Sequence, residues 1–398
     1  MKLKKIMASI LAAAAAITCL TACKSDGDSS GNDSANDSNS TASGSVLRIG
    51  GSGPLTGDYA LYGNGVKNGA QLAIDEINAA GGINGCTIEF NMQDDEAGEE
   101  KAVNAYNVLK DWDMDLSIGT VTSGACIAFG AEAAKDNMFL LTPSSTAVEC
   151  ISADNAFRVC FSDPNQGVAS ADYIAEQNLA TKIAAIYQSD NAYSAGIFDK
   201  FKSEASAKSL EIVSEQSFTS DNATDFSAQI QSIKDSGAEL LFLPIYYSEA
   251  SLILQQAKNA GLDIKVFGCD GLDGILNMKN FDISLAEGVM LLTPFAADAT
   301  DEATVHFVTE YTAKYGNETM NQFAADAYDA IYIIKAAAEQ AGINADMSSS
   351  EICDALKKAM TEITVDGVTG TSITWAADGE PSKAPKAVVI NDGSYKAM

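Results

Sequence analysis

Hydroxyl side chains gather in two short segments of the chain. Thr122-Ser123-Gly124 precedes an expected helix, and Thr142-Pro143-Ser144-Ser145-Thr146 follows the next expected strand. Free backbone N–H groups and the positive end of the helix dipole can make a helix start an anion site, which would suit a ligand carboxylate. The same hydroxyls could instead only cap the helix. The residues alone leave both interpretations open.

A catalytic centre or a metal site is not expected. His306 is the only histidine, and it falls on an expected surface helix beside acidic residues. A single histidine in that position cannot complete a Ser-His-Asp or Cys-His arrangement, although Lys-assisted or carboxylate chemistry stays open. Metal-binding spacings are missing, and Asp94, Asp95 and Glu96 are expected as polar loop residues. We therefore expect no cofactor, no metal and no enzymatic activity.

Residues 50–96 predict the elements that would position a small-molecule site. An apolar strand leads into a polar, Gly-rich loop at 53–63, an amphipathic helix at 62–80, a glycine stop and a second strand. This order is the opening unit of a parallel α/β domain, in which ligands bind beyond the carboxyl ends of the strands. The glycines from Gly63 to Gly69 lack the nucleotide-loop pattern, so we expect them to serve close helix packing.

The alternation of strands and helices continues and predicts an α/β fold with sheets covered on both faces. The folded part, about 350 residues, exceeds what one core usually supports, so two domains are expected. Further strands are expected near 114–119, 138–142, 182–187, 211–217, 239–244, 289–293, 371–375 and 386–390. Further helices are expected at 97–112, 122–136, 193–209, 226–236, 249–260, 304–315, 323–341 and 349–360.

The N-terminal segment predicts export and a lipid anchor. Three lysines precede a short apolar run, and Leu20-Thr21-Ala22-Cys23 resembles the lipobox of bacterial lipoproteins, in which the cysteine is lipidated. Residues 1–22 are then a signal peptide. Residues 23–45 are rich in Ser, Asp, Asn and Gly and predict a disordered tether. The protein is thus expected at the extracytoplasmic face of the bacterial cell membrane.

The charge of the mature chain excludes a nucleic-acid partner. Removing residues 1–22 takes away three lysines and no acid, which leaves 22 basic against 54 acidic residues and a formal charge of −32. Binding a phosphate backbone needs clustered Lys and Arg, which are outnumbered here. Six cysteines besides Cys23 remain in an oxidising compartment, and we expect either a disulfide among Cys126, Cys150 and Cys160 or buried thiols.

From Val46 to about Val389 the chain resembles the leucine/isoleucine/valine-binding family of type I periplasmic binding proteins, the amino-acid receptors of ABC importers. The resemblance rests on the opening unit, the T-P-x-x-T segment at 142–146 and Gly268-Cys269-Asp270-Gly271. It implies two doubly wound parallel-sheet lobes joined by a three-crossover hinge. The lobes would comprise residues 46–164 with 294–376, and residues 165–293 with 377–398.

The resemblance also implies a ligand site. Ser123 and Thr146 would hold the ligand α-carboxylate, with backbone groups of Ser144 and Ser145, and Asp270 would pair with the ammonium group. The aromatic residues of the site would be Tyr62, Tyr193, Tyr246 and Phe323. Two departures stand out, because the family's disulfide positions carry no cysteine here, and Asp270 is one methylene shorter than the family's glutamate.

The expected function is capture of a small amino acid, branched-chain by family habit, and its delivery to a permease and its ATPase. We expect a monomer. Two alternatives stay open: a sensory receptor that signals to a membrane partner, and a receptor for an amide or an aromatic acid.

Overall fold

The computed structural model describes residues 45–398. The predicted signal peptide, Cys23 and the tether up to residue 44 lie outside the described residues. Within the described range, no helix combines the length and the apolar content that crossing a membrane requires.

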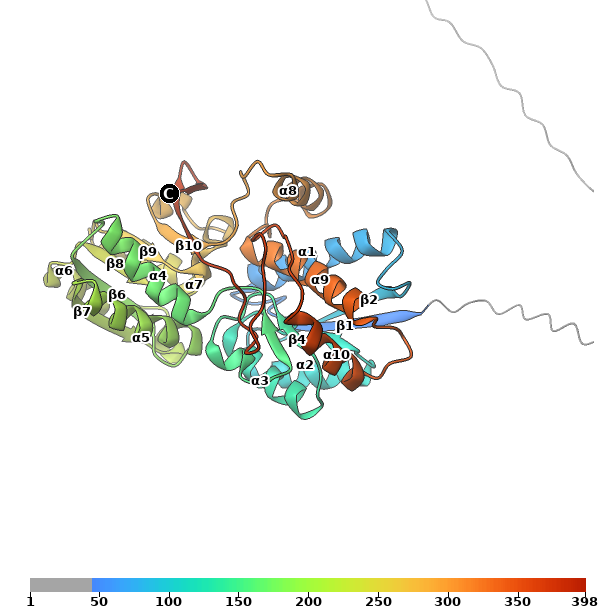
Figure 1. Cartoon of the computed structure of the whole chain (residues 1–398). Coiled ribbons are helices and arrows are strands. Elements are labelled where there is room, and N and C mark those ends of the chain that lie inside the picture. The colour runs from blue at the N-terminus through green and yellow to red at the C-terminus, as the bar shows by residue number, and fades with distance from the viewer. Residues whose placement is uncertain (1–44) are drawn as a thin grey trace, which may run out of the picture. The chain divides into compact units, whose positions relative to one another are not determined.

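A five-stranded parallel sheet forms the first lobe, in the order β2-β1-β3-β4-β5 (Figure 1). Helix α1 packs against α9 on one side of the sheet, and α2 packs against α3 on the other. The elements are β1 (Val46–Gly53), α1 (Ala60–Ala79), β2 (Thr87–Asp94), α2 (Glu99–Asp111), β3 (Leu116–Ser117), α3 (Ser123–Lys135), β4 (Leu140–Thr142), η1 (Val148–Ile151), β5 (Ala156–Arg158), α8 (Glu302–Tyr315), α9 (Gln322–Ala341) and α10 (Ser349–Met360).

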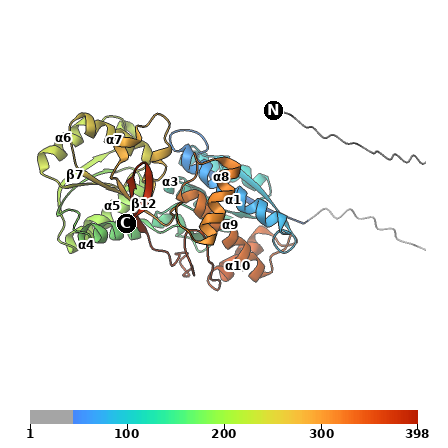
Figure 2. The ribbon, with the colours of Figure 1, turned by 90° about the horizontal axis from the view of Figure 1, so that it is seen from above.

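A seven-stranded sheet forms the second lobe, in the order β12-β11-β10-β9-β8-β6-β7. Its central strands are parallel, and β11 and β12 join one edge as antiparallel strands. Figure 2 shows α4 and α5 on one side of this lobe and α6 and α7 on the other. The elements are α4 (Asp163–Glu176), β6 (Lys182–Gln188), α5 (Ala192–Ala207), β7 (Glu211–Phe218), η2 (Ser220–Asn222), α6 (Ser227–Ser236), β8 (Leu240–Leu243), α7 (Tyr247–Asn259), β9 (Lys265–Gly268), η3 (Asp270–Leu272), η4 (Ile275–Asn277), η5 (Ile283–Ala286), β10 (Met290–Thr293), β11 (Lys386–Asn391) and β12 (Ser394–Ala397).

Close packing explains the glycines of α1. A Cβ atom at Gly63 would overlap the carbonyl group of Pro54, and one at Gly69 would overlap the carbonyl oxygen of Ala324 in α9. Both positions therefore require the smallest residue. The two helices approach so closely that Tyr62 of α1 and Phe323 of α9 meet edge to face, with ring centroids 4.9 Å apart.

The chain passes between the lobes three times. It leaves the first sheet after β5, leaves the second sheet after β10 and returns to it at β11. The third passage lies a few residues later than the sequence predicts, because the Lys383 ammonium is still 2.8 Å from Oδ1 of Asp326 in α9. The two parallel-sheet lobes confirm the predicted fold class.

The expected strand at 371–375 is wrong. This segment forms only isolated bridges, between Val365 and Ile373 and between Trp375 and Pro381. Its polar groups bind elsewhere, since the indole of Trp375 donates to the carbonyl oxygen of Arg158 at 2.8 Å. Sequence reasoning also missed β5, α4 and β12.

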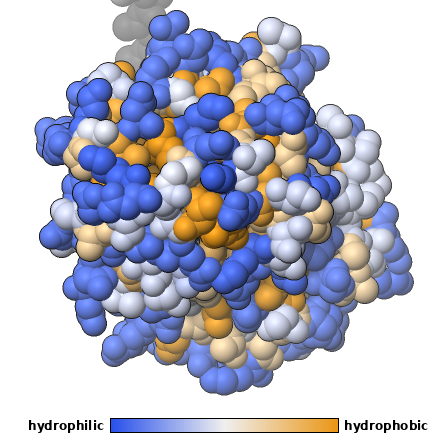
Figure 3. Space-filling view, turned by 90° about the vertical axis from the view of Figure 1, so that its left-hand side faces the viewer, coloured by the Kyte–Doolittle hydropathy of each residue, from blue (hydrophilic) through white to orange (hydrophobic). Residues whose placement is uncertain are grey.

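Most large apolar side chains of the described residues are buried, and few are exposed. Figure 3 shows the side of the second lobe that holds α6 and β7, where hydrophilic residues cover most of the face and apolar residues lie between them. The large apolar side chains that are most exposed within the described range, such as Val108, Leu252 and Val305, lie on different helices. Scattered exposure of this kind is normal for a soluble surface.

Candidate functional site

A small cavity with a free volume of only about 10 Å³ lies between the two lobes. Residues at the ends of β3 and β4, from α1 and α9, and from the loops after β8 and β9 surround it. This volume is far below the range of about 300–1,000 Å³ typical of ligand pockets, so the side chains nearly fill the space in this arrangement of the lobes. The lining residues are Tyr62, Val121, Thr122, Ser123, Ser144, Thr146, Tyr193, Tyr246, Asp270, Gly271 and Phe323.

Hydroxyl groups line the first-lobe side of the cavity. Helix α3 begins at Ser123, but the preceding Thr122 makes no side-chain capping bond, and its buried hydroxyl has no hydrogen-bond partner among the described residues. Helix capping, one of the two interpretations open from sequence, therefore does not account for Thr122. A buried hydroxyl without a partner is costly, and a ligand atom could compensate that cost.

Ser123 holds the two hydroxyl-bearing loops together. Its Oγ atom accepts backbone hydrogen bonds from Thr146 at 3.3 Å and from Ala147 at 3.2 Å. A serine hydroxyl has two lone pairs and one proton. Because both lone pairs are engaged, the Ser123 hydroxyl is left as a donor on the cavity wall.

Ser144 and Ser145 differ in placement. Ser144 lines the cavity, and its hydroxyl donates to the carbonyl oxygen of Val121 at 2.9 Å. Ser145 does not line the cavity, since its N–H donates to Oγ1 of Thr142 at 3.0 Å and its hydroxyl donates to the carbonyl oxygen of Thr120 at 3.1 Å. The backbone N–H and the carbonyl oxygen of Ser145 are both engaged inside the first lobe, and the expected contact of its backbone groups with a ligand stays a prediction.

Asp270 supplies a buried carboxylate from the second lobe. The Tyr193 hydroxyl donates to its Oδ1 atom at 2.7 Å, and its backbone N–H donates to Oε1 of Gln166 at 3.0 Å. Burial raises the pKa of Asp270 to about 7, and the hydrogen bond from Tyr193 opposes that rise. A cationic group placed in this cavity would stabilise the charged carboxylate.

Aromatic rings enclose the space between the polar ends. Tyr193 and Tyr246 stack with ring centroids 4.7 Å apart, and Tyr62 meets Tyr246 edge to face at 5.7 Å. Burial raises the pKa of Tyr62, Tyr193 and Tyr246 well above the ordinary value, so all three stay neutral donors. The arrangement offers apolar ring surface for a side chain between a hydroxyl-rich end and an acidic end.

Direct contacts hold the lobes together around the cavity. The Tyr59 hydroxyl donates to Oε1 of Glu249 at 2.7 Å, and the Gln322 N–H donates to Oδ2 of Asp273 at 2.8 Å. The Tyr62 hydroxyl donates to the carbonyl oxygen of Gly271. Such contacts across a cleft correspond to a closed arrangement of the lobes.

The six cysteines within residues 45–398 are buried free thiols. The disulfide proposed among Cys126, Cys150 and Cys160 is therefore not formed in this structure. Two of these thiols make other contacts, because Cys150 donates to the carbonyl oxygen of Ser123 at 3.6 Å and Cys160 donates to that of Ser145 at 3.4 Å. In the described part of the chain, His, Cys, Asp and Glu side chains form no cluster that could hold a metal ion.

Three comparisons place this architecture among known proteins. A family described as periplasmic binding protein matches residues 46–394. The Leu/Ile/Val-binding protein homolog 3 of Brucella melitensis biotype 1 is 30% identical over 312 residues, which cover 78% of this chain and 83% of that protein. The branched-chain amino acid transporter substrate-binding protein LivJ from Streptococcus pneumoniae, solved with isoleucine, superposes with a TM-score of 0.80 at 30% identity, covering 88% of this chain and 98% of that chain.

A more distant structure shares the fold. The solute-binding protein of an ABC transporter from R. palustris, solved with benzoate, has a TM-score of 0.78 at 20% identity and covers 89% of this chain and 95% of that chain. Two α/β lobes around a small polar cavity define the class of two-lobed solute-binding proteins. This chain belongs to the periplasmic binding protein family.

Proposed function

We propose that this protein is the extracytoplasmic solute-binding lipoprotein of an ABC importer, and that it captures a small amino acid, with branched-chain amino acids first. The observation that carries the proposal is the polarity of the cavity, in which free hydroxyl donors face a buried carboxylate across an aromatic middle. A zwitterion needs such opposite partners at its two ends. A relative named as a Leu/Ile/Val-binding protein homolog and a similar structure solved with isoleucine support this choice.

In this proposal Thr122, Ser123 and Thr146 face the ligand carboxylate, and Asp270 with Tyr193 faces the ammonium group. Backbone groups of Ser144 complete the carboxylate side. Closure of the two lobes removes the ligand from water, so its charges meet fixed partners in surroundings of low dielectric constant. The lobes are inferred to be residues 46–164 with 294–376, and 165–293 with 377–398, except that the third passage extends to about Lys383, which still contacts Asp326 of the first lobe. Cys23 would carry the lipid that keeps the protein at the membrane, where the closed form delivers its ligand to the permease as a monomer.

The aromatic rings and the benzoate-bound relative favour a second candidate ligand class, an aromatic acid. Asp270 argues against it, because an aromatic acid without a cationic group would bring no positive charge to compensate this buried carboxylate. A neutral amide is disfavoured for the same reason. A sensory role would use the same closed form, and neighbouring permease and ATPase genes would favour import over sensing.

A thermal-shift screen of the purified protein tests the proposal. The ligands are the twenty amino acids, leucinamide, benzoate and 4-hydroxybenzoate. A ligand at about a hundred times its dissociation constant adds about 2.7 kcal/mol of stability, which gives a clear shift. Shifts confined to Leu, Ile and Val would support the proposal. A shift with benzoate and none with any amino acid would overturn the ligand class and keep the family.

A further inference from the structure

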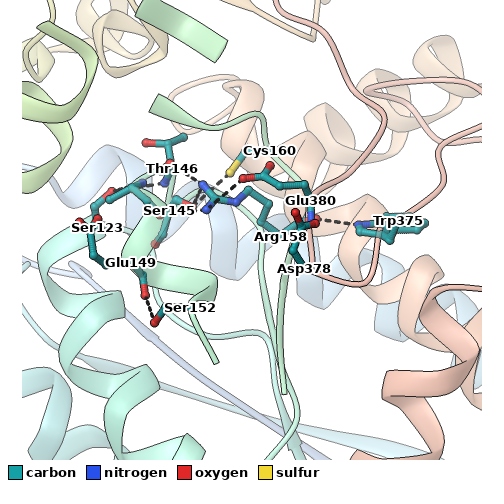
Figure 4. Close-up of polar contacts among 11 residues, drawn as sticks. Ser123, Ser145, Thr146, Glu149, Ser152, Arg158, Cys160, Trp375, Asp378 and Glu380 are labelled. Atoms are coloured by element: carbon teal, nitrogen blue, oxygen red, sulfur yellow. Dashed lines mark hydrogen bonds and ion pairs between the residues drawn. The ribbon is translucent and has the colours of Figure 1, made fainter. Parts of the chain in front are cut away.

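Arg158 is a fully buried arginine behind the hydroxyl-rich loop at residues 145–147 (Figure 4). Its guanidinium donates to three consecutive carbonyl groups: to Ser145 at 3.4 Å, to Thr146, and to Ala147 at 2.9 Å. It does not line the cavity. A planar guanidinium presents several donors in a fixed fork, and this geometry lets one side chain hold three carbonyl oxygens.

Two of the peptide groups whose carbonyl oxygens bind Arg158 also bind Ser123 through their N–H groups. The peptide between Ser145 and Thr146 and the one between Thr146 and Ala147 direct their carbonyl oxygens to Arg158 and their N–H groups to Oγ of Ser123. Each peptide group is therefore polarised from both ends, and linked hydrogen bonds of this kind strengthen one another. Hydrogen bonds thus connect the buried guanidinium of Arg158, through these two peptide groups, to the Ser123 hydroxyl on the cavity wall. We call this chain of hydrogen bonds the relay.

Two further segments hold Arg158 in place. The backbone N–H of Arg158 donates to the carbonyl oxygen of Gly379 at 3.2 Å. Its backbone carbonyl oxygen accepts a hydrogen bond from the indole N–H of Trp375 at 2.8 Å. Gly379 has a positive φ of 83°, and a Cβ there would overlap the carbonyl oxygen of Ala156, so this close approach requires glycine. Glu380 lies 3.5 Å from the guanidinium and leaves 30% of its side chain exposed.

We propose that Arg158 is a positioning residue for ligand recognition, which sets Ser123 as a hydrogen-bond donor and so gives the site its preference for a carboxylate over a neutral amide of the same shape. The inference rests on the proposed function, because it assumes that an anionic group occupies the Ser123 side of the cavity.

The experiment compares the dissociation constants of L-leucine and L-leucinamide by calorimetry. Both ligands keep the ammonium group, so the ratio of the two constants isolates the carboxylate. Arg158→Lys keeps the positive charge but replaces the planar guanidinium, whose fixed set of donors holds the carbonyl oxygens. We expect this variant to reduce the preference for leucine by about tenfold and to leave leucinamide binding nearly unchanged. A purely structural role of Arg158 would weaken both ligands equally, and that result would overturn the proposal.

Two more variants keep the test decisive. Glu380→Gln alters the same cluster without touching the loop, and it should retain the preference of the unmodified protein. Ser123→Ala removes the hydroxyl at the cavity end of the relay, and it should abolish most of the preference for leucine over leucinamide. This variant can be measured even if Arg158→Lys fails to fold. A retained preference in Ser123→Ala contradicts the relay. If the unmodified protein binds benzoate and no amino acid, the proposed ligand class fails, and the ratio of benzoate to benzamide tests Arg158 instead. If it binds no carboxylate, both proposals fall.

Discussion

The Tyr193 hydroxyl donates a 2.7 Å hydrogen bond to Asp270 and accepts one of 2.9 Å from the N–H of Gly271. Tyr193 thus fixes the orientation of the carboxylate through the backbone of the same short η3 segment. A Cβ at Gly271 would press against the Tyr193 hydroxyl, so the loop keeps its glycine where this network forms. A preorganised carboxylate needs little rearrangement when a cationic group arrives.

Asp270→Asn should weaken binding of the best amino acid by about tenfold or more. The substitution keeps the shape of the side chain and removes the charge that pairs with the ligand ammonium, and charge-assisted hydrogen bonds contribute about 1.5–3 kcal/mol. Calorimetry measures the change. Asp199→Asn on the exposed side of α5 is the matched control. Equal affinities for Asp270→Asn and the unmodified protein would contradict the assignment.

Amino-acid binding should release protons near neutral pH. The pKa of Asp270 is raised to about 7, so the folded protein holds this proton more tightly than the unfolded chain. The contribution of this proton to folding stability is fully present below about pH 4 and is lost as the pH rises toward about 7.

The affinity for an amino acid has the opposite trend, because the ligand ammonium pairs with the charged carboxylate. This affinity should rise with pH up to about pH 7. Calorimetry in two buffers of different ionisation enthalpy measures the release, and its persistence in Asp270→Asn would exclude Asp270 as the source.

Thr122→Val should weaken ligand binding without destabilising the ligand-free protein. The Thr122 hydroxyl is buried without a partner among the described residues, so its removal relieves a desolvation cost. Thr142→Val gives the contrast, because the Thr142 hydroxyl donates to Thr120 and accepts from Ser145. That variant should lose about 1–3 kcal/mol of stability. Thermal unfolding with and without ligand separates the two effects, and unchanged affinity in Thr122→Val would remove Thr122 from the site.

Tyr59→Phe should lower affinity about twofold to tenfold by weakening the closed arrangement of the lobes. The Tyr59 hydroxyl donates across the cleft to Glu249, and a hydrogen bond of this kind contributes about 0.5–1.5 kcal/mol. Burial raises the pKa of the Glu249 carboxyl, and the hydrogen bond from Tyr59 opposes that rise. Tyr173→Phe removes the hydroxyl of a tyrosine within the second lobe and is the control. Small-angle scattering should show a larger open fraction for Tyr59→Phe alone.

The sequence predicts the long elements well, because a periodic apolar pattern extends over several turns. Helix α10 has the predicted bounds Ser349–Met360, and α1 and α9 lie within a few residues of theirs. Strand β5 has only three residues and no alternation to recognise, and residues 371–375 carry strand-forming types whose polar groups are used by the hinge instead. The secondary structure of such short segments is decided by contacts with residues far away in the chain, which a local sequence pattern does not show.

The residues alone indicated the two hydroxyl-bearing loops, whereas Asp270 and the aromatic residues of the cavity could be named only through a family resemblance. The role of all of them in binding stays a prediction. The structure brings Ser123, Thr146 and Asp270 to one cavity, although they lie far apart in the chain. Arg158 had no signal in the sequence, since a lone arginine at the end of a short strand looks like a surface residue. Its contacts with residues 145–147 depend on the pairing of β5 with β4, and its contacts with Trp375 and Gly379 depend on the third passage between the lobes.

The edge position of β11 and β12 has a consequence for how the chain folds. The second sheet begins with β6 and receives its last two strands only after the chain has built α8, α9 and α10 on the first lobe. Neither lobe is a continuous segment, so a chain emerging from its N-terminus cannot finish one lobe before starting the other. Until the last residues arrive, β10 presents an unpaired edge that could pair with other chains. Folding of such non-local sheets is slow, and we expect an exported chain of this topology to depend on protection from aggregation until its C-terminus is free.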